Sequence, residues 1–142
     1  MYILIDAIAG SVGVCAAMLY SICSVESSGK NVLKHNDGGS PSYGVCQIKL
    51  STAKLFNPDV TPTMLMTPEE NVLYAALYLK KQQARYPKST ECTVASYNAG
   101  KCKKDDNGKI KNKDYVKKVK AIYRNNNRKG ILSDKRHCPE HF

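Results

Sequence analysis

Apolar residues in the N-terminal stretch recur at steps of three and four, the spacing that places side chains along one face of an α-helix. The positions concerned are Leu4, Ile8, Val12, Ala16, Leu19, Tyr20 and Cys23. Gly13 interrupts the stretch and Gly29 follows it, and glycine commonly marks a helix boundary. The pattern therefore predicts two core helices, over about Tyr2–Ser11 and Cys15–Glu26.

A long helix is predicted to begin after Thr67. The sequence Thr-Pro-Glu-Glu at residues 67–70 combines a capping hydroxyl, proline at the first helical position and acids in the first turn. The apolar residues that we expect this helix to turn inward are Val72, Leu73, Ala76, Leu77 and Leu79. The helix should end before Pro87, because proline cannot continue it.

Two further helices are predicted in the C-terminal third. A short apolar helix covers about Thr93–Ala99, and Gly100 suits the left-handed position that ends a helix. The last helix begins at Asp114, a residue suited to capping, and continues to about Asn125. Its apolar positions at helical spacing are Tyr115, Val116, Val119, Ile122 and Tyr123.

The segments between the helices are mainly polar. Residues 31–43 contain HNDGGSPSYG, which is typical of a loop. Residues 45–49 fit either a short strand or an apolar turn, and Ser51 suits the cap of a helix that reaches Phe56. Residues 101–113 form a second polar loop, in which Asn-Gly suits a hairpin turn.

Composition and charge fit one globular domain with a basic C-terminal end. The chain has 142 residues, of which 42% are hydrophobic and 24% charged, and its net charge is +10. Residues 101–142 carry 14 Lys and Arg against 5 Asp and Glu, whereas residues 1–100 carry 8 against 7. A basic end favours polyanions such as nucleic acid, anionic lipid or an acidic cell-wall polymer. A solvated lysine-rich surface that keeps the protein soluble is the alternative interpretation.

The apolar N-terminal stretch invites two other interpretations, a signal peptide and a membrane span. Asp6 interrupts it, and no Lys or Arg precedes Lys30. Both features favour core helices, so we expect neither an export signal nor a membrane span.

Six cysteines permit three disulfides in an oxidising compartment, but their spacing leaves the pairing open. Cys15, Cys23 and Cys46 lie among apolar neighbours, and we expect them to be small buried thiols. Cys92 and Cys102 flank the short helix and are the favoured bridge. The C-x-x-H motif at residues 138–141 lacks a second ligand pair, so no metal site is predicted.

Glu26 is the candidate for chemistry, because it falls in the predicted last turn of an apolar helix. The helix macrodipole places its negative end there, which disfavours an ionised acid. Desolvation by apolar neighbours acts in the same direction, so both effects raise the carboxyl pKa and suit a general acid. A partly exposed glutamate that only helps to end the helix is the alternative.

Five segments together carry a family resemblance. They are ESSGK, SYGVCQIKLSTAK, NVLYAALYLKKQ, ASYNAGK and DYVKKVKAIY. In order and approximate spacing they resemble the lysozyme-like domain of soluble lytic transglycosylases over about residues 3–125. The resemblance implies a mainly α-helical, lysozyme-like fold with a saccharide-binding groove and at most a small β-hairpin. We expect this domain to cover residues 1–130, followed by a C-terminal tail over residues 131–142.

The resemblance also implies an activity. It is cleavage of the β-1,4 bond between N-acetylmuramic acid and N-acetylglucosamine in peptidoglycan, with formation of 1,6-anhydromuramoyl ends. Glu26 matches the acid/base: it would protonate the leaving oxygen and then take the proton from the muramic 6-hydroxyl. No metal or organic cofactor is needed for this reaction.

Seven further residues match positions that bind substrate in the family. Ser27 follows the acid, with a capped turn as its alternative role, and Ser42 contacts either sugar or the loop backbone. Gly44 would let the chain pass close to the substrate, although any tight turn would also favour glycine. Gln47 matches the glutamine that contacts the N-acetyl sugars. Where the family often has Gly-Leu-Met-Gln, this chain has Gly-Val-Cys-Gln, so a smaller thiol replaces the methionine.

The other three matches lie in the C-terminal half of the chain. Tyr97 matches the phenol that hydrogen-bonds and orients the glutamate, and Asn98 matches its neighbour or serves the helix end. Tyr115 matches the groove-lining tyrosine of the last helix, with a core tyrosine as the alternative.

Three rival functions stay open at this point. A hydrolytic muramidase on the same fold would need a second carboxylate, and Asp37 is the acid in the following loop. A non-catalytic wall-binding or assembly protein would not need Glu26. A nucleic-acid binder would need an organised cationic face, whereas Lys117, Lys118 and Lys120 share their helix with core positions, as solvated faces do.

The expected partners are peptidoglycan glycan strands, without specific nucleic acid. A compact chain without its own export signal fits an enzyme that a phage virion or a conjugation or secretion apparatus delivers to the wall. We therefore expect action on the cell wall, in the periplasm or outside the cell.

Overall fold

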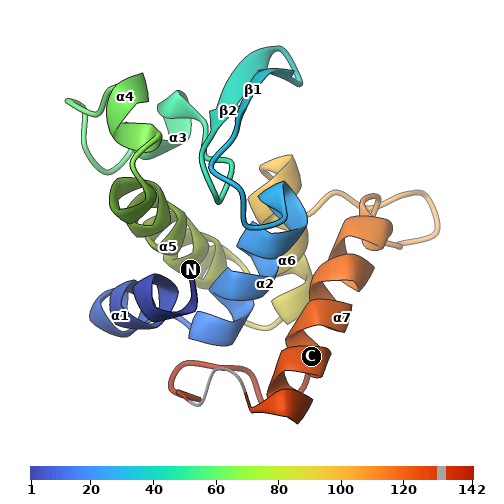
Figure 1. Ribbon diagram of the computed structural model, residues 1–142. Helices are drawn as coiled ribbons and strands as arrows, with labels where there is room; N and C mark the ends of the chain where they lie inside the picture. The colour runs from blue at the N-terminus through green and yellow to red at the C-terminus, as the bar shows by residue number, and fades with distance from the viewer. Residues whose placement is uncertain (131–133) are drawn as a thin grey trace.

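The computed structural model describes residues 1–130 and 134–142 (Figure 1). Its elements are α1 (Tyr2–Val12), α2 (Ala16–Ser27), β1 (Leu33–Asp37), β2 (Ser40–Tyr43), α3 (Leu50–Ala53), α4 (Pro62–Leu65), α5 (Pro68–Arg85), α6 (Thr90–Ala99) and α7 (Lys113–Lys129). The five helices predicted from apolar spacing are all present, as α1, α2, α5, α6 and α7. The last helix extends to Lys129, one turn beyond the predicted end.

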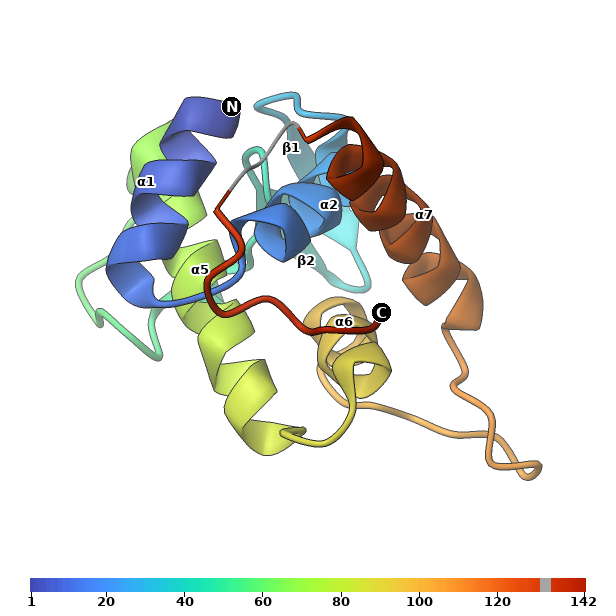
Figure 2. The ribbon, with the colours of Figure 1, turned by 90° about the horizontal axis from the view of Figure 1, so that it is seen from below.

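Helix α2 occupies the centre of the molecule. Helices α1 and α5 lie on one side of it, α7 packs along the other, and the hairpin β1–β2 covers one end (Figures 1 and 2). Among its fully buried side chains are Leu19, Ile22 and Cys23. A helix that is buried on most of its faces needs apolar residues around its whole circumference. Its residue Glu26 is therefore held on a helix that is buried along most of its length.

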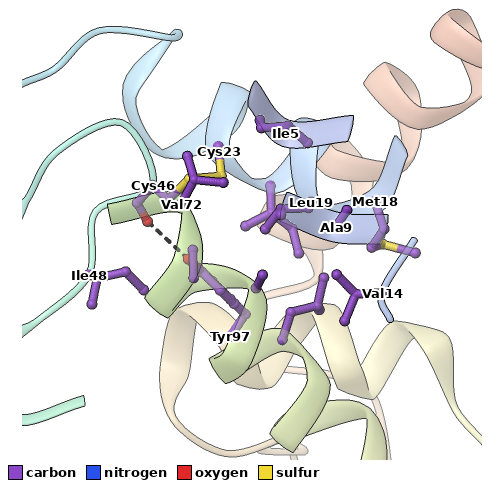
Figure 3. Packing of buried hydrophobic residues seen from close by; sticks show 14 of the residues in the cluster. Ile5, Ala9, Val14, Met18, Leu19, Cys23, Cys46, Ile48, Val72 and Tyr97 are labelled. Atoms are coloured by element: carbon purple, nitrogen blue, oxygen red, sulfur yellow. Dashed lines mark hydrogen bonds between the residues drawn. A yellow bond between two sulfur atoms is a disulfide. The ribbon is translucent and has the colours of Figure 1, made fainter. Parts of the chain in front are cut away.

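The core fills the space between α1, α2, α5 and α6. Ile5 and Ala9 of α1 face Leu19 of α2, and Val72 and Leu79 of α5 are completely buried (Figure 3). Of the residues expected to point inward from α5, Leu73 and Leu77 are only half-buried. Their positions flank the buried stripe, so a period of 3.6 residues leaves them at its margin.

Residues 33–43 form a two-stranded antiparallel hairpin where a loop was predicted. The pairs are Leu33 with Tyr43, Lys34 with Ser42 and Asp37 with Ser40. Gly38 and Gly39 both have positive φ, as a two-residue hairpin turn requires. Strand β1 is exposed along its whole length and lacks alternating apolar residues, which is why the pattern did not reveal it. Residues 44–47 form a turn, and Ile48 makes an isolated β-bridge with Tyr43.

Three disulfides cross-link the chain. The predicted Cys92–Cys102 bond is confirmed, whereas the prediction of buried thiols is wrong, since Cys15 bonds to Cys138 and Cys23 to Cys46. Cys15, Cys23 and Cys46 are buried, as expected. Burial alone does not reveal a partner that lies 23 or 123 residues away in sequence.

The C-terminal residues 134–142 contain no helix or strand, and the bond from Cys138 ties them to the start of α2 (Figure 2). The first residues of the predicted tail, 131–133, lie outside the described part of the chain. Among the described helices, none is both long enough and apolar enough to cross a membrane.

Candidate active site

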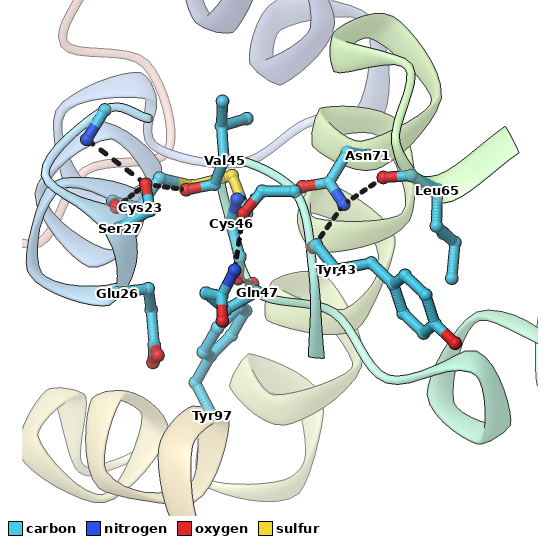
Figure 4. The surroundings of a disulfide bond; sticks show 12 residues. Cys23, Glu26, Ser27, Tyr43, Val45, Cys46, Gln47, Leu65, Asn71 and Tyr97 are labelled. Atoms are coloured by element: carbon cyan, nitrogen blue, oxygen red, sulfur yellow. Dashed lines mark hydrogen bonds between the residues drawn. A yellow bond between two sulfur atoms is a disulfide. The ribbon is translucent and has the colours of Figure 1, made fainter. Parts of the chain in front are cut away.

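Glu26 lies in the last turn of α2, which ends where Ser28 adopts a left-handed conformation. Its side chain lines a pocket of about 260 Å³ between the hairpin and the C-terminal end of α6. The other residues lining this Glu26 pocket are Asp37, Ser42, Gln47, Ile48, Lys49, Thr52, Tyr78, Tyr97, Asn98, Ala99 and Gly100. In Figure 4 the side chain of Glu26 extends from the end of α2 and lies beside Gln47 and Tyr97.

The environment of Glu26 raises its pKa above the ordinary value for a glutamate. Burial is the largest cause, because it penalises the charged form, and the negative charge of Asp37 adds to it. The hydroxyl of Tyr115, the charge of Lys34 and the amide of Asn98 act in the opposite direction. Burial dominates, so the carboxyl holds its proton to higher pH, as a general acid must.

Two tyrosines exchange the roles expected of them. Tyr115 of α7 donates a hydrogen bond to Oε2 of Glu26 at 2.8 Å. Tyr97, expected to orient the glutamate, donates instead to the carbonyl of Cys46 at 3.1 Å. The contact expected of Tyr97 is therefore corrected: its hydroxyl bonds to the turn that carries Gln47, and the hydroxyl that contacts Glu26 is that of Tyr115. The fold decides this, because α7 packs along α2 and brings Tyr115 to the helix end.

Gln47 presents one end of its amide to the pocket. Its Nε2 donates to the carbonyls of Gly44 at 2.8 Å and Val32 at 2.9 Å. Its Oε1 is buried and has no hydrogen-bond partner among the described residues. An unsatisfied buried acceptor is costly, so this oxygen is suited to receive a donor from a bound molecule.

The family model described as Transglycosylase SLT domain matches residues 3–120. The chain belongs to the transglycosylase SLT domain family. None of the curated proteins matches it. Membership confirms the family expected from the five segments, and the helices with their small hairpin confirm the mainly α, lysozyme-like fold. The SLT domain family acts on the glycan strands of peptidoglycan, a component of the cell wall.

Ser27 and Gly44 shape the SLT domain beneath its pocket without lining it. The Oγ of Ser27 donates to the carbonyl of Val45 at 2.6 Å and accepts from the backbone N–H of Gly29 at 3.1 Å. Gly44 has φ of 78°, and a Cβ there would overlap Nδ2 of Asn71. The substrate contacts expected of Ser27 and Gly44 are not supported by these positions, since the Ser27 hydroxyl is bonded to the protein and Asn71 fills the space beside Gly44.

Asn71 is a residue that the sequence analysis missed. It is completely buried on α5, where its Nδ2 donates to the carbonyls of Tyr43 and Leu65 and its Oδ1 accepts from the backbone N–H of Cys46. It thereby fixes both ends of the turn that carries Gln47 (Figure 4). The available signal was an amide beside the predicted inward stripe of α5, a position that usually holds an apolar residue.

The opposite wall of the pocket comes from the hairpin. Ser42, which is buried, donates to Oδ2 of Asp37 at 2.8 Å, and both residues line the pocket. Lys49 donates to Oγ of Ser40 at 2.8 Å and also to the carbonyl of Asp37. The site therefore brings Glu26, Ser42, Gln47, Tyr97 and Asn98 to one pocket, with Tyr115 contacting it through Glu26.

Asn98 connects the pocket to the start of α7. Its Oδ1 accepts a hydrogen bond from Nδ2 of Asn112 at 3.1 Å, and the same Nδ2 donates to the carbonyl of Ala95 at 3.0 Å. Within residues 1–130 and 134–142, no group of three His, Cys, Asp or Glu side chains is placed to hold a metal ion.

Proposed function

We propose that the SLT domain is a peptidoglycan lytic transglycosylase that cleaves the β-1,4 bond between N-acetylmuramic acid and N-acetylglucosamine. The observation that supports this most is the carboxyl of Glu26, which is buried at a pocket wall, has a raised pKa and accepts a hydrogen bond from Tyr115. A single carboxyl in this state serves first as an acid and then as a base.

The proposed reaction proceeds in two proton transfers. Glu26 gives its proton to the glycosidic oxygen as the bond from that oxygen to C1 of the muramic sugar breaks. The 6-hydroxyl oxygen of the same sugar then bonds to C1, and its proton passes to the Glu26 carboxylate. The carboxyl is restored, no water is consumed, and the product carries a 1,6-anhydromuramoyl end.

The polar groups around the pocket suit an N-acetylated sugar. The unpartnered Oε1 of Gln47 would accept a hydrogen bond from an N-acetyl N–H. Asn98 and Ser42 place further polar groups on the walls. Tyr115 would keep the carboxyl in one orientation during both proton transfers, since its hydroxyl is fixed on Oε2.

Product analysis tests this proposal directly. Purified sacculi are digested with the protein and with Glu26→Gln, and the soluble fragments are separated by liquid chromatography and identified by mass spectrometry. We expect 1,6-anhydromuramoyl ends from the wild type and almost no release by the variant. Reducing muramic ends would contradict the transglycosylase, and full activity of Glu26→Gln would contradict the acid/base role.

Hydrolysis is the second candidate, because Asp37 lines the same pocket as Glu26. A muramidase would use this second carboxylate to direct water or to stabilise the positive charge at C1. Substitution of Asp37 by asparagine separates the two candidates. A hydrolase should lose most of its activity in Asp37→Asn, whereas the transglycosylase should keep its anhydro products.

The location of action is also part of the proposal. Three disulfides favour an oxidising compartment, so we infer that the enzyme works in the periplasm, outside the cell or on a virion. Delivery by a virion or by a conjugation or secretion apparatus stays a prediction. Mass spectrometry of purified particles or apparatus that contain the protein would test it.

A further inference from the structure

A second and larger depression lies on the other side of the α6–α7 contact. Its volume is about 790 Å³, and it is bounded by the N-terminal half of α6, the loop over residues 101–112 and one face of α7. The residues that line this basic cleft are Ser89, Glu91, Cys92, Lys104, Gly108, Lys109, Ile110, Lys113, Asp114, Val116, Lys117, Lys120, Ala121 and Arg124. None of them lines the Glu26 pocket.

The basic cleft has an excess of positive charge that the fold organises. Lys113, Lys117, Lys120 and Arg124 follow one another at steps of four, three and four, so they form one stripe on α7. Lys104 and Lys109 face them from the loop. Against these six cations stand Glu91, which pairs with Lys120 at 3.2 Å, and Asp114. The cleft therefore carries a net charge of about +4 and favours an anionic ligand.

The floor of the basic cleft is apolar. Cys92 and Val116 are buried at its base, and Ile110 is half-buried beside them. No aromatic side chain lines it among the described residues, and Arg124 is its one arginine. Single-stranded nucleic acids are usually held by aromatic stacking along a cationic groove. Cations around an aliphatic floor fit an acidic peptide with small apolar side chains better.

Residues next to the basic cleft in the chain contact residues of the Glu26 pocket. Tyr115, which contacts Glu26, lies between Lys113 and Lys117 of the cationic stripe. Asn112 directly precedes that stripe and donates to Asn98 of the pocket. A branched polymer that places a sugar against Glu26 therefore brings its nearby branches close to this cleft.

We propose that the basic cleft binds the acidic peptide branches of peptidoglycan while the glycan strand occupies the Glu26 pocket. The inference rests on the proposed function, because it takes peptidoglycan as the substrate. Those peptides combine carboxylates with alanine methyl groups, which match the lysines and the aliphatic floor. The cleft thus selects glycan that carries peptides over bare glycan.

Binding by a cleavage-deficient protein tests the inference. Glu26→Gln is sedimented with intact sacculi and with glycan strands from which an amidase has removed the peptides. In the same background, Lys109→Gln/Lys113→Gln/Lys117→Gln is compared with Lys30→Gln/Lys54→Gln/Lys81→Gln, which removes three exposed lysines elsewhere on the surface. The two triple variants have the same net charge, and thermal unfolding shows whether both are folded.

We expect the cleft variant to bind intact sacculi about tenfold more weakly and the control variant to bind like its parent, since three exposed ionic contacts together contribute about 1.4 kcal/mol. Stripped glycan should bind both variants equally. Equal binding of intact and stripped material by the parent would overturn the inference. So would a cleft variant that loses binding only to single-stranded DNA. Reducing ends in the product analysis would contradict the proposed function but leave this binding comparison unchanged.

Discussion

The two walls of the Glu26 pocket are built in opposite ways. The wall with Glu26 belongs to the central helix α2 and is fixed by the Cys23–Cys46 disulfide and the buried hydrogen bonds of Ser27. The wall with Asp37 belongs to a hairpin whose strand β1 is exposed and which Lys49 and a few polar contacts hold in place. Burial therefore gives one carboxyl a raised pKa, while the other remains an exposed charge beside it. Two acids at one pocket therefore lie in different surroundings, one buried and one exposed.

The largest difference between the walls should appear when each acid is replaced by its amide. We expect Glu26→Gln to lower the rate of glycan cleavage by about 10²–10⁴-fold, because the amide can neither donate nor accept the transferred proton. Asp37→Asn should change the rate by less than about tenfold. Release of soluble fragments from sacculi measures both. Equal losses of cleavage rate in the two variants would contradict the proposed difference between Glu26 and Asp37.

The same substitution should stabilise the fold. The pKa of Glu26 is higher in the folded protein than in the unfolded chain, so the unfolded chain releases this proton first as the pH rises. Stability is therefore lost as the pH rises through the folded value. Glu26→Gln should be more stable than the wild type at neutral pH, and this advantage should vanish in acid, below the ordinary glutamate pKa. Urea unfolding at both pH values measures it.

The next largest effect concerns the disulfide of the buried wall. Cys23→Ala/Cys46→Ala should cost about 2–5 kcal/mol of unfolding free energy. It should also lower the activity of the molecules that remain folded, because it releases the Gln47 turn from the helix of Glu26. Cys92→Ala/Cys102→Ala is the matched control, since that bond does not join the two parts of the pocket. Equal losses of activity per folded molecule would contradict a positioning role for the Cys23–Cys46 bond.

Alanine substitutions of two glycines compare the turn that carries Gln47 with the hairpin, without a change of charge. Gly44 and Gly39 both have positive φ, but a Cβ at Gly44 would overlap Asn71, whereas one at Gly39 meets nothing within 4 Å. Gly39→Ala should therefore cost only the backbone strain of about 1–2 kcal/mol. Gly44→Ala should cost clearly more, because Asn71 must move and release the turn. Chemical denaturation measures the loss of unfolding free energy in each variant. Equal losses would show that the turn is loosely packed around Gly44.

The smallest effects are shifts in pH dependence. Cleavage needs protonated Glu26, so the rate should fall as the pH rises through its pKa. Tyr115→Phe removes a hydrogen bond that lowers this pKa, and the fall should move to higher pH. Asp37→Asn removes a charge that raises it, and the fall should move to lower pH. Shifts in the same direction in profiles of kcat/KM would contradict the electrostatic assignment.

The helices and the candidate acid could be predicted from the sequence, because both depend on local signals. Apolar spacing is enough to predict α1, α2 and α5, and the position of Glu26 at the end of an apolar helix is enough to suggest a raised pKa. The hairpin was missed although its two glycines signalled a turn, since β1 has no apolar face.

Contacts between distant elements could not be predicted in the same way. Whether Tyr97 or Tyr115 reaches Glu26 depends on how α7 packs along α2, over a separation of 89 residues. The partners of Cys15, Cys23 and Asn71 likewise follow from tertiary packing. The division into a domain over residues 1–130 and a tail over residues 131–142 stays a prediction.

The central claim is that the buried wall keeps Glu26 protonated to higher pH than an ordinary glutamate. Titration of the glutamate side-chain carbonyl carbons by NMR, with Glu26→Gln to assign the signal, measures this pKa directly. A titration midpoint clearly above the ordinary pKa of a glutamate is the result expected here. A midpoint at or below the ordinary glutamate pKa would contradict the account.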